Sequence, residues 1–102
     1  IDIARGHIDI FNYLIKNNQG FLILNLGSGK GFSILEVIDT FETTNKCKIP
    51  LKFLPRRVGD VSSLIADISY AKKIIGWLPK LELSEMCIDS FSWYREVINN
   101  NF

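Results

Sequence analysis

The sequence predicts a small α/β domain in which a βαβ unit of parallel strands is flanked by helices. Three observations lead to this fold class. Apolar residues recur at helical spacing near both ends of the chain, and two short apolar runs in the middle are typical of buried strands. A glycine-rich loop and a helix-capping sequence lie between the two runs. A strand, a helix and a second strand in this order are expected to form a right-handed parallel unit.

The first predicted helix spans Asp2 to Asn17, where isoleucine, leucine and phenylalanine side chains gather on one side. Asp2 is expected to cap its start, and Asn17, Asn18 and Gly20 are expected to end it. The next segment, Phe21 to Asn25, is a continuous apolar run. Such a run favours a strand that is buried on both faces.

The second predicted helix begins at a capping box formed by Ser33 and Glu36 and runs through Phe41. Residues Lys46 to Pro50 are expected to break it. The apolar segment Leu51 to Leu54 then predicts the second strand, which completes the βαβ unit.

Two further helices are expected after this unit. Ser69 is predicted to cap a short helix, Tyr70 to Ile75, which ends at Gly76. Trp77 to Pro79 forms a rigid connector, and Ser84 is predicted to cap a long final helix.

Bulk properties exclude several classes of function. At 102 residues and 47% hydrophobic content, the chain is one globular domain at most. Its net charge of +1 arises from mixed signs, so we expect no nucleic-acid partner, and no apolar run reaches the ~20 residues that cross a membrane. Cys47 and Cys87 have no ligand spacing and indicate reduced thiols in a cytoplasmic protein without a metal site. The chain begins at Ile1, within an amphipathic pattern, which indicates a fragment.

The glycine-rich loop does not match either phosphate-binding motif. Leu24 stands where a Walker loop needs its first glycine, and Gly31 stands where that loop needs Ser or Thr. Phe32 occupies the place of the third glycine in the dinucleotide-binding fingerprint. We therefore expect Gly27, Gly29 and Gly31 to supply positive-φ turns between strand and helix. A ligand contact by Lys30 remains the alternative.

The segment Pro55 to Asp60, PRRVGD, carries the most distinctive chemistry. Gly59 allows a tight turn that brings Arg57 and Asp60 toward one cleft. A guanidinium binds phosphate oxygens in a bidentate manner, while a carboxylate accepts hydrogen bonds from ribose hydroxyls. The pair is thus a candidate nucleoside-diphosphate clamp, with an exposed structural ion pair as the alternative.

Other residue types in the chain favour structural roles. His7 has no second base or metal ligand at suitable spacing, so a surface or structural role is expected. Glu85 and Asp89 lie one turn apart and predict a solvated helix face. Four aromatic residues are predicted to lie in the core: Tyr70, Trp77, Trp93 and Tyr94.

Four stretches, in order along essentially the whole chain, carry a family resemblance. They are DIARGHIDIF, LNLGSGKGFSILEVIDTFE, PRRVGD followed by ADISYAKKIIGWLPK, and LSEMCIDSFSWY. With these motifs the chain resembles the UDP-glucose 4-epimerases, which are extended short-chain dehydrogenases/reductases. The resemblance implies that residues 1–102 form an incomplete C-terminal lobe that binds UDP-sugar.

The resemblance also implies a division of labour. A Rossmann domain N-terminal to this lobe would bind NAD and carry a Ser/Thr–Tyr–Lys set that interconverts UDP-glucose and UDP-galactose through a 4-keto intermediate. The enzyme would be a cytoplasmic homodimer. By similarity, Arg57 would hold the pyrophosphate and Asp60 the ribose, Val58 and Gly59 would form the turn, and Leu64 would lie beside the sugar. Family members often carry Tyr or Cys at the position of Leu64, so acceptance of N-acetylated sugars stays open.

No catalytic residue is expected in this chain. The YxxxK pattern is absent, because Ile74 stands four residues after Tyr70 where the lysine is needed. The chain alone is therefore expected to be inactive. Three alternatives remain: the lobe of another extended sugar-nucleotide dehydratase, reductase or epimerase, a non-catalytic interaction module, or phosphate binding by the glycine-rich loop.

Overall fold

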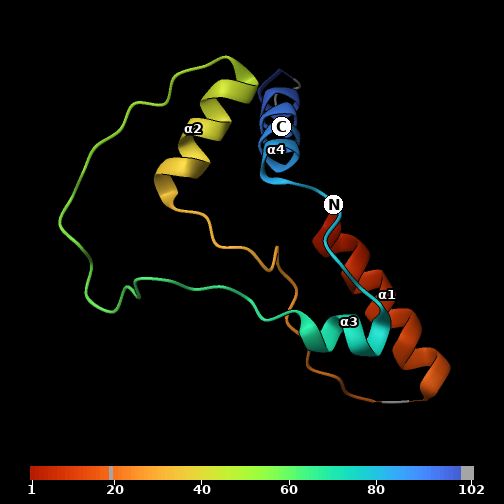
Figure 1. Ribbon diagram of the computed structural model, residues 1–102. Coiled ribbons are helices and arrows are strands. Elements are labelled where there is room, and N and C mark those ends of the chain that lie inside the picture. The colour runs from red at the N-terminus through yellow and green to blue at the C-terminus, as the bar shows by residue number, and fades with distance from the viewer. Residues whose placement is uncertain (19, 100–102) are drawn as a thin grey trace. The chain divides into compact units, whose positions relative to one another are not determined.

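The computed structural model describes residues 1–18 and 20–99, and within them it contains four helices and no β-strand (Figure 1). The helices are α1 (Asp2–Asn17), α2 (Ile34–Asn45), α3 (Ser69–Ile75) and α4 (Leu83–Asn99). They form two compact units. Unit 1 comprises residues 1–31 and 63–80, and unit 2 comprises residues 32–62 and the segment from Leu81 onward.

The predicted βαβ unit is wrong, because the described residues are all-helical apart from extended and looped segments. The two apolar runs belong to different units, Phe21 to Asn25 to unit 1 and Leu51 to Leu54 to unit 2. A strand exists only when its backbone pairs with another strand, and an apolar sequence alone does not supply that partner. Phe21 is 76% exposed and Phe53 is 79% exposed, so neither run is buried as the prediction required.

Helix α1 has the predicted bounds, but its capping differs from the prediction. Asn18 adopts a left-handed conformation with φ of 49° and ends the helix, as expected. Ile1 is the N-cap and provides no side-chain hydrogen bond, so Asp2 is not the cap. Asp2 is instead the first helical residue, where its negative charge interacts favourably with the helix dipole.

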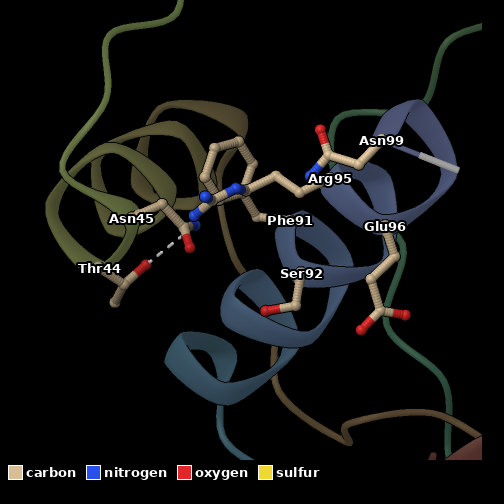
Figure 2. A pocket seen from close by; sticks show the side chains of 7 residues that line it. All are labelled: Thr44, Asn45, Phe91, Ser92, Arg95, Glu96 and Asn99. Carbon is tan, nitrogen blue, oxygen red and sulfur yellow. Dashed lines mark hydrogen bonds between the residues drawn. The ribbon is translucent and has the colours of Figure 1, made fainter.

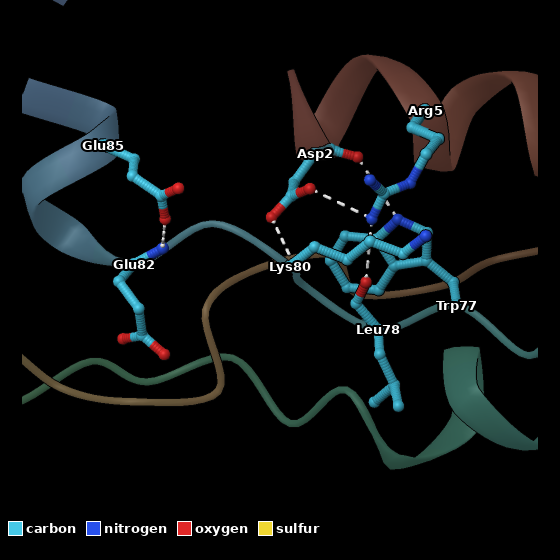
Figure 3. A network of polar contacts seen from close by, with 7 residues as sticks. All are labelled: Asp2, Arg5, Trp77, Leu78, Lys80, Glu82 and Glu85. Carbon is cyan, nitrogen blue, oxygen red and sulfur yellow. Dashed lines mark hydrogen bonds and ion pairs between the residues drawn. The ribbon is translucent and has the colours of Figure 1, made fainter. Parts of the chain in front are cut away.

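The Asp2 carboxylate connects the start of α1 with the segment after α3 (Figure 3). It accepts a hydrogen bond from the Lys80 backbone N–H at 2.7 Å and forms a 3.0 Å ion pair with Arg5. Arg5 in turn donates to the Leu78 carbonyl at 3.1 Å, and the Trp77 indole N–H donates to the Asp2 carbonyl at 3.2 Å. These contacts fix the connector, Trp77 to Pro79, and the adjoining Lys80 against the first turn of α1.

Gly6 lets α1 approach this connector closely. A Cβ at this position would lie 2.6 Å from Leu26 Cδ1 and 2.9 Å from Trp77 Nε1. The indole of Trp77 is only 2% exposed. Among the described residues of unit 1, the buried apolar ones are Trp77 and Ala71 of α3. The predicted core position of Trp77 is thus confirmed.

Helix α3 begins and ends close to its predicted bounds. Ser69 is its first residue and not its cap, because Ile68 is the N-cap and makes no side-chain hydrogen bond. The Asp67 carboxylate accepts from the Ser69 N–H at 2.9 Å, and this hydrogen bond lowers the pKa of Asp67. Gly76, with φ of 66°, ends the helix as predicted.

Helix α2 confirms the predicted capping box. The Ser33 hydroxyl accepts from the Glu36 N–H at 3.2 Å, and the Glu36 carboxylate accepts from the Ser33 N–H at 2.7 Å. Hydrogen bonding to Ser33 lowers the pKa of Glu36. The helix runs to Asn45, and Lys46, its C-cap with a φ of 51°, ends it where the predicted break begins.

Helices α2 and α4 pack against each other in unit 2 (Figure 1). The rings of Phe41 and Phe91 meet edge to face with centroids 5.5 Å apart. The Asn45 side chain donates to the Cys87 carbonyl at 3.2 Å and to the Phe41 carbonyl at 3.1 Å, which ties the end of α2 to α4. Cys87 is buried, and this burial raises the pKa of its thiol. Cys87 and Cys47 are both unbridged.

Helix α4 begins one residue before the predicted cap. Its first residue is Leu83, so Ser84 lies inside the helix and does not cap it. The Glu85 carboxylate accepts from the Glu82 N–H at 2.8 Å, as Glu36 does for Ser33 in α2.

The core prediction is wrong for Tyr70, Trp93 and Tyr94, which are each more than half exposed. None of the helices in the described part of the chain is long and apolar enough to span a membrane.

Candidate functional site

The segment PRRVGD folds into a tight turn at the surface of unit 2. The Asp60 N–H donates to the Arg57 carbonyl at 3.4 Å, and Gly59, the third residue of the turn, has a φ of 91°. A positive φ at this position is typical of a type II turn and favours glycine. A Cβ on Gly59 would meet no atom within 4 Å, so the backbone angle, and not a lack of space, requires glycine here.

The turn brings the two predicted ligand-binding side chains together. Arg57 Nε lies 3.3 Å from Asp60 Oδ2. The Arg57 side chain is 86% exposed and that of Asp60 is 44% exposed. An ion pair this exposed contributes about 1 kcal/mol or less to stability, so a ligand can replace it at small energetic cost. Both charged groups are therefore available to a ligand from the same edge of the turn.

Sequence reasoning missed the contribution of Arg56. Its guanidinium donates a hydrogen bond to the Asp60 carbonyl at 2.8 Å. This contact joins the residue before the turn to the last residue of the turn. Two adjacent arginines gave no signal as to which one pairs with the carboxylate and which one holds the backbone. The structure separates the two roles.

The remaining predicted site residues are exposed. Val58 forms the tip of the turn and is fully exposed. Leu64 is 89% exposed and belongs to unit 1, in the irregular segment that precedes α3. Within the described residues, nothing covers either side chain.

The glycine-rich loop packs against residues 65–68 and does not form an open cradle for a phosphate. A Cβ at Gly27 would lie 2.8 Å from Ala66 Cβ, and one at Gly31 would lie 2.8 Å from Ile65 Cδ1. Only Gly29 has a positive φ, 66°, so the prediction that all three glycines supply such turns is wrong for the other two. Close packing against residues 65–68 explains Gly27 and Gly31. This loop also lacks the third glycine of a dinucleotide site, so its residues do not fit NAD.

A surface pocket of about 430 Å³ lies between α2 and α4 and contains no predicted site residue (Figure 2). The Arg95 guanidinium lies 6.0 Å from the centre of the Phe91 ring, and the Asn45 side chain contacts Thr44 at 3.4 Å. The lining residues are Thr44, Asn45, Phe91, Ser92, Arg95, Glu96 and Asn99. Asn45 also donates to the Cys87 carbonyl of α4, and Thr44 and Arg95 contact residues of their own helices, which favours a structural role for this pocket.

His7, Glu85 and Asp89, which were also singled out in the sequence, are exposed on their helices. His7 is exposed on α1, with Nδ1 2.8 Å from the Ile3 carbonyl, in keeping with its predicted surface role. Glu85 and Asp89 are exposed as predicted. Among residues 1–18 and 20–99, no three His, Cys, Asp or Glu side chains gather as a metal site.

Comparison with known proteins finds that the chain is similar to UDP-glucose 4-epimerases. The chain is 37% identical over 99 residues to the UDP-glucose 4-epimerase of Bacillus subtilis, covering 97% of the chain and 29% of that enzyme. It is 41% identical over 101 residues to the UDP-glucose 4-epimerase of Neisseria meningitidis serogroup C, covering 99% of the chain and 28% of that enzyme. No protein-family model matches the chain.

Solved structures lead to the same enzyme. A UDP-glucose 4-epimerase from Stenotrophomonas maltophila, crystallised with NAD and formylated UDP-arabinopyranose, matches with a TM-score of 0.87 and 35% identity. The chain matches part of a UDP-glucose 4-epimerase in sequence and in structure. The match covers 97% of the chain and 29% of that epimerase. The epimerase of Bifidobacterium longum, in complex with NAD⁺ and UDP, matches over the same shares with a TM-score of 0.84 and 35% identity.

The resemblance to UDP-glucose 4-epimerases predicted from the sequence is thus confirmed. The chain spans less than a third of the length of the epimerases that it matches.

Proposed function

We propose that this chain is the C-terminal, UDP-sugar-binding part of a UDP-glucose 4-epimerase. The observation that carries the proposal is the PRRVGD turn, on which an exposed guanidinium and an exposed carboxylate lie 3.3 Å apart. Its context supports the proposal, because the chain is 35–41% identical to UDP-glucose 4-epimerases over nearly its whole length.

The chemistry of the turn fits a uridine diphosphate. Arg57 binds the pyrophosphate, since a planar guanidinium matches two phosphate oxygens at once. Asp60 accepts hydrogen bonds from the ribose hydroxyls, because a carboxylate has only acceptor positions. Val58 and Gly59 hold the two side chains at this separation. Leu64 lies beside the sugar and limits the room at its 2-position.

A strong grip on the nucleotide suits epimerisation. A sugar that must turn over between two hydride transfers cannot be held tightly, so the binding energy comes from the non-reacting UDP. In this proposal the rest of the polypeptide supplies a Rossmann domain that binds NAD and a Ser/Thr–Tyr–Lys set. The intact enzyme interconverts UDP-glucose and UDP-galactose through a 4-keto intermediate. It works as a cytoplasmic homodimer in galactose metabolism.

Exposed apolar side chains support a covalently linked partner domain. On α1, Ile8, Phe11 and Ile15 are each at least 60% exposed. They lie on the side of the helix away from Gly6, which contacts Trp77. Ile23 and Leu54, in the two apolar runs, are exposed as well. Large apolar side chains exposed in this number are typical of faces that another part of a protein covers.

The experiment compares two substitutions in the intact polypeptide that carries this chain. Arg57→Ala is expected to weaken UDP binding by about 2–4 kcal/mol, typical for the loss of a charged hydrogen-bond partner in a buried complex. Lys30→Ala, in the glycine-rich loop, is expected to leave UDP affinity within about 0.5 kcal/mol, the usual size of surface substitutions. Isothermal titration calorimetry with UDP measures both.

The opposite result would place the phosphate-binding site in the glycine-rich loop. If Lys30→Ala abolished UDP binding and Arg57→Ala left it unchanged, the glycine-rich loop would be the phosphate site. Equal UDP affinities in wild type and both variants would reject both sites.

A further inference from the structure

We propose that Gly27 and Ala66 form a contact that positions Leu64 and thereby sets which sugars the site accepts. The inference rests on the proposed function, in which Leu64 lies beside the sugar. It goes beyond that function because it assigns sugar specificity to a residue of the glycine-rich loop, which contacts no ligand itself.

The contact is between two groups that cannot move independently of the backbone. A Cβ at Gly27 would lie 2.8 Å from Ala66 Cβ, whereas carbon atoms in ordinary contact lie about 3.5–4.0 Å apart. Because a Cβ is attached directly to the main chain, no change of rotamer relieves such a clash. A side chain at Gly27 therefore displaces the backbone at residue 66 by roughly 1 Å.

The displacement is transmitted to Leu64 over two residues. Residues 64–68 form an irregular segment before α3, and the glycine-rich loop packs against this segment at two further points. A Cβ at Gly31 would lie 2.8 Å from Ile65 Cδ1, and one at Gly29 would lie 3.1 Å from Ile68 Cδ1. The far end of the segment is fixed by the Asp67 carboxylate on the Ser69 N–H at 2.9 Å. A shift at Ala66 is thus passed on toward Leu64, whose 89% exposed side chain nothing in the described chain restrains.

Leu64 and the PRRVGD turn respond separately to such a shift. The turn lies in unit 2 and is closed by its own hydrogen bonds, from Asp60 N–H to Arg57 and from Arg56 to Asp60. Substitution of Gly27 is therefore expected to alter recognition of the sugar and to leave recognition of UDP intact.

The test is a set of four variants of the intact polypeptide, with dissociation constants measured by calorimetry. The variants are Gly27→Ala, Ala66→Gly, the double variant Gly27→Ala/Ala66→Gly, and Gly20→Ala. Gly20→Ala is the matched control, because a Cβ at Gly20 meets nothing within 4 Å. The ligands are UDP, UDP-glucose and UDP-N-acetylglucosamine, of which the last two differ only at the sugar 2-position.

Gly27→Ala is expected to change the ratio of the two UDP-sugar dissociation constants roughly tenfold. A change of about one methyl group in the space beside a substrate, here at Leu64, alters discrimination by this amount. Its UDP affinity is expected to stay within about twofold of wild type, because the turn is an independent site. The double variant exchanges the methyl group between the two positions, so it is expected to restore the wild-type ratio. A general folding defect would reduce the binding-competent fraction and leave this ratio unchanged.

Three results would overturn the inference. The ratio in Gly27→Ala could equal that in Gly20→Ala, the double variant could fail to restore it, or UDP affinity could fall in parallel with that of the sugars. In each case the proposed function stands as long as wild type binds UDP and UDP-glucose. If wild type bound neither, the proposed function and the inference would fail together.

Discussion

At the scale of single residues, the account depends on how Arg57 and Asp60 share a ligand. They are 3.3 Å apart and both reach solvent, so each can exchange its partner for a ligand group. In the proposed function, Arg57 binds the pyrophosphate and Asp60 binds the ribose. The two assignments can be separated, because inorganic pyrophosphate contains only the group that Arg57 binds.

Asp60→Ala is therefore expected to affect two ligands differently. In the intact polypeptide it should weaken UDP by about 1.5–3 kcal/mol, the range for hydrogen bonds to a charged group. Inorganic pyrophosphate should bind as in wild type or more tightly, because removal of the carboxylate leaves Arg57 without an internal partner. Competition calorimetry measures both affinities. Equal weakening of the two ligands would show that Asp60 does not act on the ribose.

At the scale of elements, the Glu42 side chain connects the end of α2 with the segment that follows it. The Glu42 carboxylate accepts from Lys48 Nζ at 2.6 Å and from the Ile49 N–H at 2.7 Å. The hydrogen bond from Lys48, followed by that from the Ile49 backbone, lowers the pKa of Glu42 below its usual 4.5. The same contact raises the pKa of Lys48.

The sign of the pH dependence follows from this direction. A carboxyl whose pKa is lower in the folded state stabilises the fold at pH values above its usual 4.5. That contribution is lost as the pH falls through the lowered folded value. We expect carboxyl NMR titration to give Glu42 a pKa below 4.5, and Lys48→Ala to move it toward 4.5, whereas Lys52→Ala should not. A Glu42 pKa at or above 4.5 in wild type would contradict the contact.

The packing of α1 on the connector gives a second prediction at this scale. Gly6→Ala introduces a Cβ 2.6 Å from Leu26 Cδ1 and 2.9 Å from Trp77 Nε1. Overpacking costs about 1–3 kcal/mol, and the better helix propensity of alanine offsets up to about 1 kcal/mol of that. We expect a net loss of about 1–2 kcal/mol in thermal unfolding of the intact polypeptide. A melting temperature equal to that of Gly20→Ala would show that α1 has room at this point.

At the scale of the whole molecule, the chain exposes more apolar surface than an independent domain tolerates. Its buried apolar residues among those described are Ala71, Trp77 and Cys87, while Phe11 and Phe53 are more than 60% exposed. We expect the isolated chain to bind a dye such as ANS and to self-associate in size-exclusion chromatography. It should show no measurable binding of UDP-glucose, because in the proposed function the rest of the polypeptide supplies the other walls of the cleft. Micromolar affinity for UDP-glucose in calorimetry would contradict this view.

Elements whose signals are local were predicted well from the sequence. The bounds of α1, the capping box of Ser33 and Glu36, and the end of α3 at Gly76 all follow from residues within a few positions of one another. The capping roles of Ser69 and Ser84 were wrong, because a serine near a helix start can as well be the first or second helical residue.

Features that depend on distant residues were not predictable. The apolar runs at 21–25 and 51–54 suggested strands, but strand formation requires a partner backbone that their own sequences do not specify. The contact of Gly27 with Ala66 was invisible for the same reason. In the candidate site, the tight turn at Gly59 was predictable, because glycine is the residue that most readily adopts a positive φ, and Gly59 does so. The role of Arg56 was not, since it depends on which carbonyl its side chain reaches.

The most direct test of the central claim is a crystal structure of the intact polypeptide with UDP. The account predicts that the Arg57 guanidinium leaves Asp60 and binds pyrophosphate oxygens at about 2.7–2.9 Å, with the Asp60 carboxylate on the ribose hydroxyls. A UDP molecule bound elsewhere, with Arg57 and Asp60 still paired at 3.3 Å in the turn, would contradict it.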